Sequence, residues 1–245
     1  MTRQALFISD LHLSGERPDT SEQFFRFLHD EARRAGALYV LGDLFEYWPG
    51  DDELEEAEGD ALAREVASAF RDLAEHGVQL RLMHGNRDFL IARRFCDASV
   101  ASLLADLSVV EIEGGKTVLL HGDTLCTDDV DYQAWRRTAH SADWQRDFLS
   151  KPLSARHQAI QGLRAKSKEV IAIKPADIMD VNETAVREAF RRHGVRRMIH
   201  GHTHRPARHV HEVDGRSCER WVLPDWYGPG GYLAVDDVGP RLVSF

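Results

Sequence analysis

The stretch Leu6-Phe7-Ile8-Ser9-Asp10-Leu11-His12 runs from a short apolar segment directly into an aspartate and a histidine. The chain repeats this arrangement four more times, each time with an apolar segment of strand length followed by residues that bind metals well. The seven residues of this kind are Asp10, His12, Asp43, Asn86, His121, His202 and His204. Ligands bind at the carboxyl ends of strands in open α/β sheets. If the five strands are neighbours, the seven side chains meet at one place and are enough to hold two metal ions.

The first third of the chain alternates between strand-like and helix-like patterns. A capping-box pair, Thr20 and Gln23, predicts the start of a helix after the first strand, and Gly36 predicts its end. A second helical stripe stops at Gly77, and an apolar run at residues 78–83 follows it. This βαβαβ order predicts parallel strands joined by right-handed crossovers.

Later segments predict further strands and one interruption. Gly114-Gly115 lies between two strand-like runs and predicts a tight hairpin, and four more strand-like runs follow His204. We therefore expect one α/β domain, residues 1–245, built on two β-sheets. Residues 127–180 carry aromatic and aliphatic side chains at helical spacing. We interpret them as a helical lid insertion over the strand ends; the alternative is packing against the side of the core.

The composition is that of an ordinary globular protein, with 43% hydrophobic and 29% charged residues. The net charge of −9 argues against non-specific binding to nucleic acid, which depends on neutralising phosphates with Lys and Arg. Three cysteines without metal or disulfide spacing favour a reducing compartment. No apolar run approaches the about 20 residues needed to cross a bilayer. Because Asp10 and His12 also interrupt the first apolar stretch too early for a signal peptide, we expect a cytoplasmic protein.

Charge is unevenly distributed along the chain. Residues 51–60 carry seven acidic side chains, whereas residues 151–174 carry six Lys or Arg and one acid, Glu169. The basic stretch has two interpretations. It is either a solvated helix face or a local attractor for anionic lipid head groups or an anionic substrate.

The seven donors favour particular ions and a particular class of substrate. Mixed imidazole and oxygen ligands favour Mn²⁺, Fe²⁺, Co²⁺ or Zn²⁺ over Ca²⁺. Two divalent ions bring four positive charges, and the carboxylates of Asp10 and Asp43 remove only two of them. The remaining charge suits a phosphate ester or a pyrophosphate. Two ions that share a water lower its pKa and hold both oxygens of an in-line displacement.

Residues next to the donors also have predicted roles. Asp43 is the candidate for bridging two ions, and Arg87 for contacting phosphoryl oxygens where charge accumulates in the transition state. Asp88 and Asp123 are candidates for partners of His or Arg side chains, with a role as turn or cap residues as the alternative. Taken singly, each motif is also compatible with a purely structural role. The five motifs together, each after its own strand, favour the metal site.

The five motifs, in this order, resemble those of the calcineurin-like binuclear metallophosphoesterase family over residues 10–204. The resemblance implies a two-sheet β sandwich flanked by helices, with the metals at the ends of the sheets. Phosphoprotein phosphatases of this superfamily have a histidine after the motif asparagine. The residue here is Arg87, which counts against a protein phosphatase.

Longer segments are similar to the UDP-2,3-diacylglucosamine pyrophosphohydrolases of lipid A synthesis. These segments are residues 42–48, 85–90, 121–129, 178–182 and 201–206. The resemblance implies water attack on the α-phosphorus of UDP-2,3-diacylglucosamine, with release of UMP and 2,3-diacylglucosamine 1-phosphate (lipid X). It also implies two Mn²⁺ ions, with other divalent transition metals as alternatives. The implied location is the cytoplasmic face of the inner membrane, in peripheral contact with its lipid.

The resemblance assigns roles residue by residue. The first ion is assigned to Asp10, His12, Asp43 and His204, and the second to Asp43, Asn86, His121 and His202. The implied catalytic set is Asp43, Asn86, Arg87 and His202. The implied substrate contacts are Asn86, Arg87, Asp129, Ser167, Lys174 and His202. Ile171 stands where the family has a polar substrate contact, so the chain departs from the pattern there.

Three other functions stay open at this point. The same metal pair suits another phosphodiesterase or a nucleotide phosphatase. A non-catalytic scaffold that kept the fold is a second alternative, although all seven donor positions are intact. The basic stretch at residues 151–174 alone supports a third, a membrane-recruited interaction module.

Overall fold

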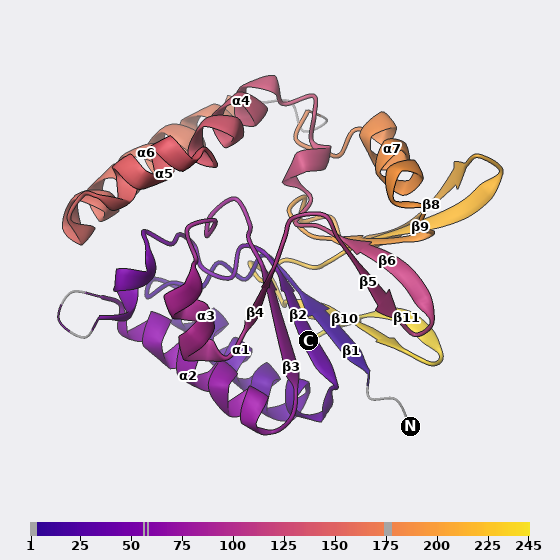
Figure 1. Cartoon of the computed structure of the whole chain (residues 1–245), viewed down its shortest axis with the longest axis horizontal. Helices are drawn as coiled ribbons and strands as arrows, with labels where there is room; N and C mark the ends of the chain where they lie inside the picture. Colours follow the sequence, from indigo (N-terminus) through magenta and orange to yellow (C-terminus); the bar gives the residue numbers. More distant parts are fainter. Residues whose placement is uncertain (1–3, 56, 58, 174–177) are drawn as a thin grey trace.

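Two β-sheets form the centre of the computed structural model (Figure 1). It describes residues 4–55, 57, 59–173 and 178–245, with residues 166–173 described by their backbone alone. The first sheet has the strand order β11-β10-β1-β2-β3-β4, and the second has the order β5-β6-β7-β9-β8. The strands are β1 (Ala5–Ile8), β2 (Ala37–Leu41), β3 (Gln79–Met83), β4 (Ser102–Leu104), β5 (Ser108–Ile112), β6 (Gly115–Leu119), β7 (Arg197–His200), β8 (Ala207–Val213), β9 (Arg216–Val222), β10 (Gly231–Asp236) and β11 (Gly239–Ser244).

The helices surround the two sheets. They are α1 (Pro18–Asp30), α2 (Ala61–Glu75), α3 (Arg93–Ser99), α4 (Val130–Ala139), α5 (Ala142–Leu149), α6 (Leu153–Ile173) and α7 (Glu183–His193), with the short 3-10 helices η1 (Ala32–Arg34), η2 (Asp51–Leu54) and η3 (Asp123–Leu125). Among the described residues, no helix combines the length and the apolar character needed to cross a membrane.

The strand pairing explains how five strand ends come together. β1, β2, β3 and β4 are parallel neighbours in the first sheet, as the βαβαβ pattern predicts. β6, β7 and β9 are parallel neighbours in the second sheet, and β5 pairs with β6 as the predicted hairpin around Gly114. Parallel neighbours end at the same edge of a sheet, so the turns after β1, β2 and β3 adjoin one another, as do those after β6 and β7. The predicted two-sheet architecture flanked by helices is therefore confirmed.

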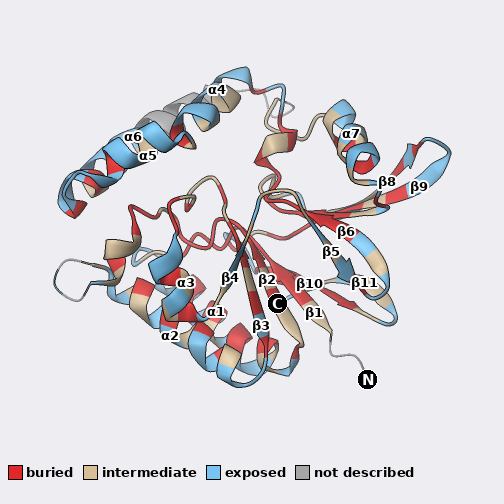
Figure 2. Cartoon of the chain, in the orientation of Figure 1, coloured by how far each residue is buried: buried red, intermediate tan, exposed pale blue. Residues whose placement is uncertain are grey.

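Alternation along the strands produces the layers. Leu6 and Ile8 pack in the core under α1 and α2, whereas Phe7, between them, packs with Leu119 and Ile199 between the two sheets. The first sheet is thus covered on both faces, which explains why its parallel strands read as continuous apolar runs. A third core joins the second sheet to α7. Figure 2 shows the resulting buried residues along the central strands.

Two expected boundaries are wrong. α1 begins at Pro18 after the N-cap residue Arg17, which makes no side-chain cap, and Thr20 is buried inside the helix. Proline suits a first helical turn because its φ is preset and it has no N–H to satisfy, so Pro18 overrides the capping-box pattern at Thr20. The helix also ends at Asp30, and η1 rather than a continued helix leads to Gly36.

Helices α4, α5 and α6, here called the insertion helices, lie within residues 127–180. Figure 1 shows them together on the side of the molecule toward which the carboxyl ends of β1, β2 and β3 point. Phe89, in the turn after β3, stacks on His140 with ring centroids 4.7 Å apart. The ring centroids of Phe89 and Trp144 are 6.1 Å apart. The insertion helices therefore contact the turns at the strand ends, and their function as a lid stays a prediction.

Candidate metal centre

Strand ends place all seven predicted donors at one edge of the two sheets. Asp10 follows β1, Asp43 follows β2 and Asn86 follows β3, while His121 follows β6. His202 and His204 follow β7. Backbone hydrogen bonds join these turns across the sheets, including one from the Asp10 amide to Gly42 (3.1 Å) and one from the Gly201 amide to His121 (2.8 Å).

Five of the seven donors have left-handed backbone conformations. The φ angles are 54° for Asp10, 51° for His12, 53° for Asp43, 69° for His202 and 54° for His204. Such conformations are uncommon for residues other than glycine and cluster at functional sites. Their concentration in these turns indicates that backbone strain is accepted here in order to orient the donor side chains.

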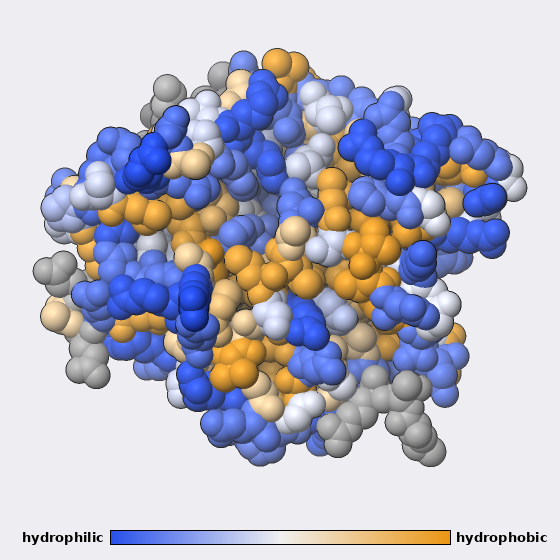
Figure 3. Space-filling view, viewed as in Figure 1, coloured by the Kyte–Doolittle hydropathy of each residue, from blue (hydrophilic) through white to orange (hydrophobic). Residues whose placement is uncertain are grey.

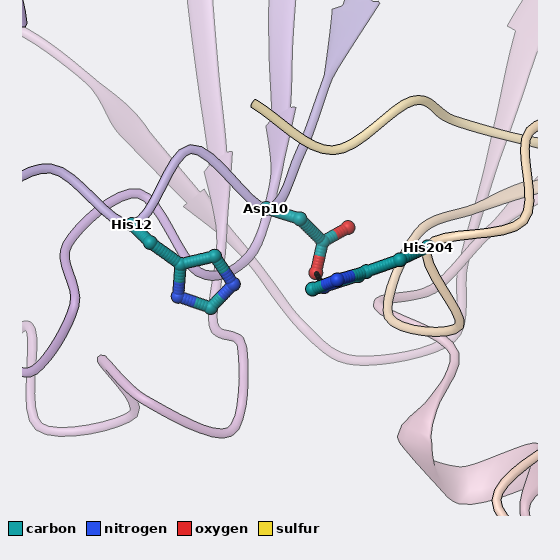
Figure 4. A group of neighbouring side chains, drawn as sticks. All are labelled: Asp10, His12 and His204. Atoms are coloured by element: carbon teal, nitrogen blue, oxygen red, sulfur yellow. Dashed lines mark ion pairs between the residues drawn. The ribbon is translucent and has the colours of Figure 1, made fainter. Parts of the chain in front are cut away.

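The first group of donors contains Asp10, His12 and His204, whose candidate ligand atoms all lie within 4.8 Å of one another. Figure 4 shows the Asp10 carboxylate directed at the His204 ring, with His12 on the other side. His204 Nε2 lies 3.3 Å from Asp10 Oδ1. The other oxygen of Asp10 accepts a hydrogen bond from the His202 amide at 2.8 Å, which fixes the carboxylate in place.

The second group is centred on Asn86. Its Oδ1 atom lies 3.0 Å from His121 Nε2 and 3.0 Å from His202 Nδ1. His121 Nδ1 donates to the carbonyl oxygen of Leu41 at 2.9 Å, which leaves Nε2 facing Asn86 and the centre. A carbonyl acceptor on the outer ring nitrogen is the usual way in which proteins orient a metal-binding histidine.

Asp43 joins the two groups. Its Oδ2 atom lies 3.7 Å from His12 Nε2 and also 3.7 Å from His121 Nε2. Its Oδ1 atom accepts the Arg87 backbone amide at 2.8 Å. Gly85 must be glycine because a Cβ there would collide with the Asp43 carboxylate. One oxygen of Asp43 therefore faces one histidine from each group.

The buried carboxylates dominate the electrostatics of the centre. Burial raises the pKa of Asp43, and His121 and His12 offset this only in part. Burial opposes a charge on His121 as well, yet the carboxylates of Asp43, Asp10 and Asp123 raise its pKa to about 9. His202, also buried and near His121, has its pKa lowered to about 4. The carboxylates thus favour positive charge at this place.

Unpartnered polar atoms fit the same interpretation. Asp10 Oδ1 and both ring nitrogens of His12 are buried and make no hydrogen bond of good geometry within the described chain. Buried polar groups without partners cost free energy. Carboxylate, amide and imidazole donors with unfilled coordination fit divalent transition metals.

A match to a known sequence family covers most of the chain. The calcineurin-like phosphoesterase family matches residues 4–206, which include all seven donors. The chain belongs to this family.

Relatives of this phosphoesterase match it over nearly its full length. A UDP-2,3-diacylglucosamine hydrolase from Aromatoleum aromaticum is 50% identical over 97% of this chain and 95% of its own. A protein of the same name from Pseudomonas paraeruginosa is 48% identical, with 98% of each chain covered, and one from Klebsiella pneumoniae is 44% identical with the same coverage. The resemblance predicted from the motifs is confirmed.

The two acidic residues predicted to assist the donors differ in what they contact. Asp123 accepts hydrogen bonds from the Arg136 guanidinium and the Tyr132 hydroxyl of α4, each at 2.6 Å, as the predicted partner of an Arg side chain. Asp88 instead accepts the backbone amides of Gly85 (2.8 Å) and Leu44 (2.7 Å), which agrees with the alternative, a role as a turn residue. Asp88 fixes the turns after β2 and β3 rather than a side chain.

The predicted substrate contacts are placed unequally. Arg87 lies in the turn after β3, and its Nε atom is buried without a hydrogen bond to any described residue. Asp129 caps α4, where its carboxylate accepts the Tyr132 amide at 3.1 Å. Ser167 lies on α6, in the part described by its backbone alone, and Lys174 lies outside the described residues.

Three residues beside the centre make contacts that the sequence did not predict. Glu46 is buried, and Tyr227 and Arg164 both contact its carboxylate. Burial would raise the pKa of Glu46, but His12 and Arg164 lower it to about 2. Glu46 follows Asp43 by three residues, and this proximity was its only signal. Arg164 lies 118 positions away, a separation that local pattern cannot bridge.

Proposed function

We propose that this phosphoesterase hydrolyses the pyrophosphate bond of UDP-2,3-diacylglucosamine and releases UMP and 2,3-diacylglucosamine 1-phosphate. The substrate is supported by the hydrolases of that name that match nearly the whole chain. The reaction class is supported above all by Asp43, whose Oδ2 atom is 3.7 Å from a histidine of each donor group. A carboxylate oxygen shared in this way suits a two-ion hydrolase.

The donors fit two divalent ions, with Asp10, His12, Asp43 and His204 holding one and Asp43, Asn86, His121 and His202 holding the other. We propose Mn²⁺, which accepts mixed imidazole and oxygen ligands, and other divalent transition metals fit the same donors. When bound, such a pair supplies Lewis-acid charge and lowers the pKa of a bound water to about 7.

Side chains around the centre position the substrate. The Arg87 guanidinium, whose Nε lacks a hydrogen bond within the described chain, contacts the non-bridging oxygens of the attacked phosphate. Asn86 and His202, held together at 3.0 Å, contact the same phosphate. Asp129, Ser167 and Lys174 contact the remainder of the substrate from the insertion helices and the segment that follows them.

The insertion helices act as a lid that holds the acyl chains. Trp135, Leu149 and Leu163 on these helices are exposed although they are large and apolar. Figure 3 shows hydrophobic side chains gathered along the border between the insertion helices and the rest of the chain. Each buried methylene contributes about 0.8 kcal/mol, so two acyl chains supply ample binding energy. The same surface, with its basic neighbours, supports peripheral contact with the cytoplasmic face of the inner membrane.

The test is an assay of purified protein loaded with Mn²⁺ on UDP-2,3-diacylglucosamine in water enriched in ¹⁸O. We expect release of UMP that carries the heavy oxygen, because water attacks the α-phosphorus. Heavy oxygen in the lipid product instead would overturn the site of attack. No release of UMP, together with rapid hydrolysis of bis-p-nitrophenyl phosphate or a cyclic nucleotide, would favour another phosphodiesterase.

A further inference from the structure

Glu46 contacts both a metal donor and an insertion helix. Its Oε2 atom lies 3.3 Å from His12 Nδ1 and accepts a hydrogen bond from the Tyr227 hydroxyl at 3.1 Å. Its Oε1 atom accepts a hydrogen bond from Arg164 of α6 at 2.7 Å. The residue is 8% exposed. One buried side chain therefore connects the turn after β1, the carboxyl-terminal tail and α6.

The contact with His12 is a close approach of a carboxylate to the outer ring nitrogen, at 3.3 Å, rather than a hydrogen bond of good geometry. His12 Nε2 faces Asp43, and Nδ1, on the other side of the ring, faces Glu46. A carboxylate on the outer nitrogen fixes the tautomer and raises the basicity of a metal-binding histidine. Tyr227 also helps to hold the His12 ring. It stacks on that ring with centroids 4.9 Å apart, and its hydroxyl donates a hydrogen bond to Glu46.

The contact with Arg164 differs from the other attachments of α6. His157 and Arg156, nearer the start of α6, pair with Glu53 and Asp52 of η2, and neither acid contacts a predicted donor. Arg164 also lies over the Tyr47 ring, with its guanidinium carbon 5.4 Å from the ring centroid. Among the described attachments of α6, Arg164 is thus the one that contacts a neighbour of the metal centre.

We propose that Glu46 is a positioning residue that holds His12 for metal binding and links this orientation to the docking of α6 through Arg164. Release of α6 then frees one oxygen of Glu46, and docking of α6 over bound lipid restrains the carboxylate against His12. The test of this link that uses the lipid substrate rests on the proposed function. The test that measures metal binding does not.

The first experiment measures Mn²⁺ binding by isothermal titration calorimetry on metal-stripped protein. We expect Glu46→Gln, which keeps the shape but removes the charge, to weaken binding of one of the two ions by about 10–100-fold. Glu46→Asp should recover part of this loss, and circular dichroism should verify the fold of both variants. Wild-type affinity for both ions in Glu46→Gln would overturn the positioning role. Equal weakening in Glu46→Asp and Glu46→Gln would overturn the role of the charge.

The second experiment is a double-mutant cycle on KM for the lipid substrate. Arg164→Ala should raise KM by at least about threefold in the wild-type background and have little further effect in Glu46→Gln. His157→Ala, which breaks another attachment of the same helix, is the matched control and should act equally in both backgrounds. Full additivity of Arg164→Ala and Glu46→Gln would overturn the link. Absence of lipid hydrolysis by the wild type would instead overturn the proposed function and leave the calorimetric result standing.

Discussion

Asp43 occupies a tightly constrained position. It is buried, and its backbone is in the left-handed region. One of its carboxylate oxygens accepts the Arg87 amide, and the other faces two histidines. Burial raises the pKa of this carboxylate, so the site favours it as an anion only when a cation is close. The residue is therefore better suited to binding metal than to stabilising the fold.

Replacing Asp43 tests this interpretation. We expect Asp43→Ala to lose about a thousandfold or more in turnover, because the ions supply several kcal/mol of transition-state stabilisation. The metal content measured by elemental analysis should fall with it. The melting curve of metal-stripped protein should change little, and near-normal turnover in the variant would contradict a bridging role.

His200 provides a prediction on pH. Burial and the neighbouring Arg220 lower its pKa to about 3, and its Nε2 atom accepts a hydrogen bond from Arg220 at 3.1 Å. The folded protein thus keeps His200 neutral, whereas the unfolded chain takes up a proton near pH 6.5. Stability from this residue is present above pH 6.5 and is lost as the pH falls toward 3.

The comparison with a variant that does not titrate isolates this effect. Between pH 6.5 and 5.5, the free energy of unfolding of wild type should fall by about 1 kcal/mol relative to His200→Gln. Urea unfolding of both metal-stripped proteins at the two pH values measures the difference. A difference that stays constant with pH would contradict the lowered pKa.

At the scale of single residues, the sequence predicted which side chains meet at the strand ends better than it predicted the partners of their neighbours. Asp10, Asp43 and His202 could be predicted because each comes directly after its own strand. The partners of Glu46 could not, because Tyr227 is 181 positions away and Arg164 is 118. The two roles open for Asp88 could not be separated from sequence, because its partners are backbone amides, which leave no trace in sequence.

Among the elements, α6 is attached through several side chains, one of which is a buried arginine, Arg156. Arg156 is 2% exposed, pairs with Asp52 and donates to the carbonyl oxygen of Pro49. Helix periodicity predicted helices in residues 127–180. It did not predict the Arg156–Asp52 pair, here called the anchor, because Asp52 lies in an acidic stretch typical of solvent-exposed surface.

Removing the anchor should loosen the helix more than the core. We expect Arg156→Ala to cost about 1–3 kcal/mol, because Asp52 is left without its partner although water still reaches it. Hydrogen exchange should accelerate in α5 and α6 and stay unchanged in β1, β2 and β3. Lys151→Ala, which breaks an exposed pair with Asp147, is the control and should cost less than about 1 kcal/mol. Equal acceleration in both variants would contradict the anchoring role.

The whole molecule is held together by the core between its two sheets. Phe7 and Met83 from the first sheet pack with Leu119 and Ile199 from the second. The βαβαβ order and the later strand-like runs predicted two sheets. Which faces meet depends on the crossovers and on the tail, which returns β10 to pair with β1. Sequence pattern does not encode such pairings between distant segments.

A shared core predicts that both sheets unfold together. Leu119→Ala should lower the free energy of unfolding by about 2–5 kcal/mol and shift the tryptophan fluorescence and far-UV circular dichroism transitions equally. Val210→Ala, on an exposed position of β8, should shift neither transition appreciably. Transitions that separate in the Leu119 variant would indicate two independent folding units rather than one domain over residues 1–245.

Anomalous diffraction at the manganese edge, from crystals grown with Mn²⁺ and shown to cleave the lipid substrate, tests the central claim most directly. We expect two peaks flanking the Asp43 carboxylate, one beside Asp10, His12 and His204 and the other beside Asn86, His121 and His202. A single peak, or peaks away from these seven side chains in crystals that are still active, would contradict the two-ion centre.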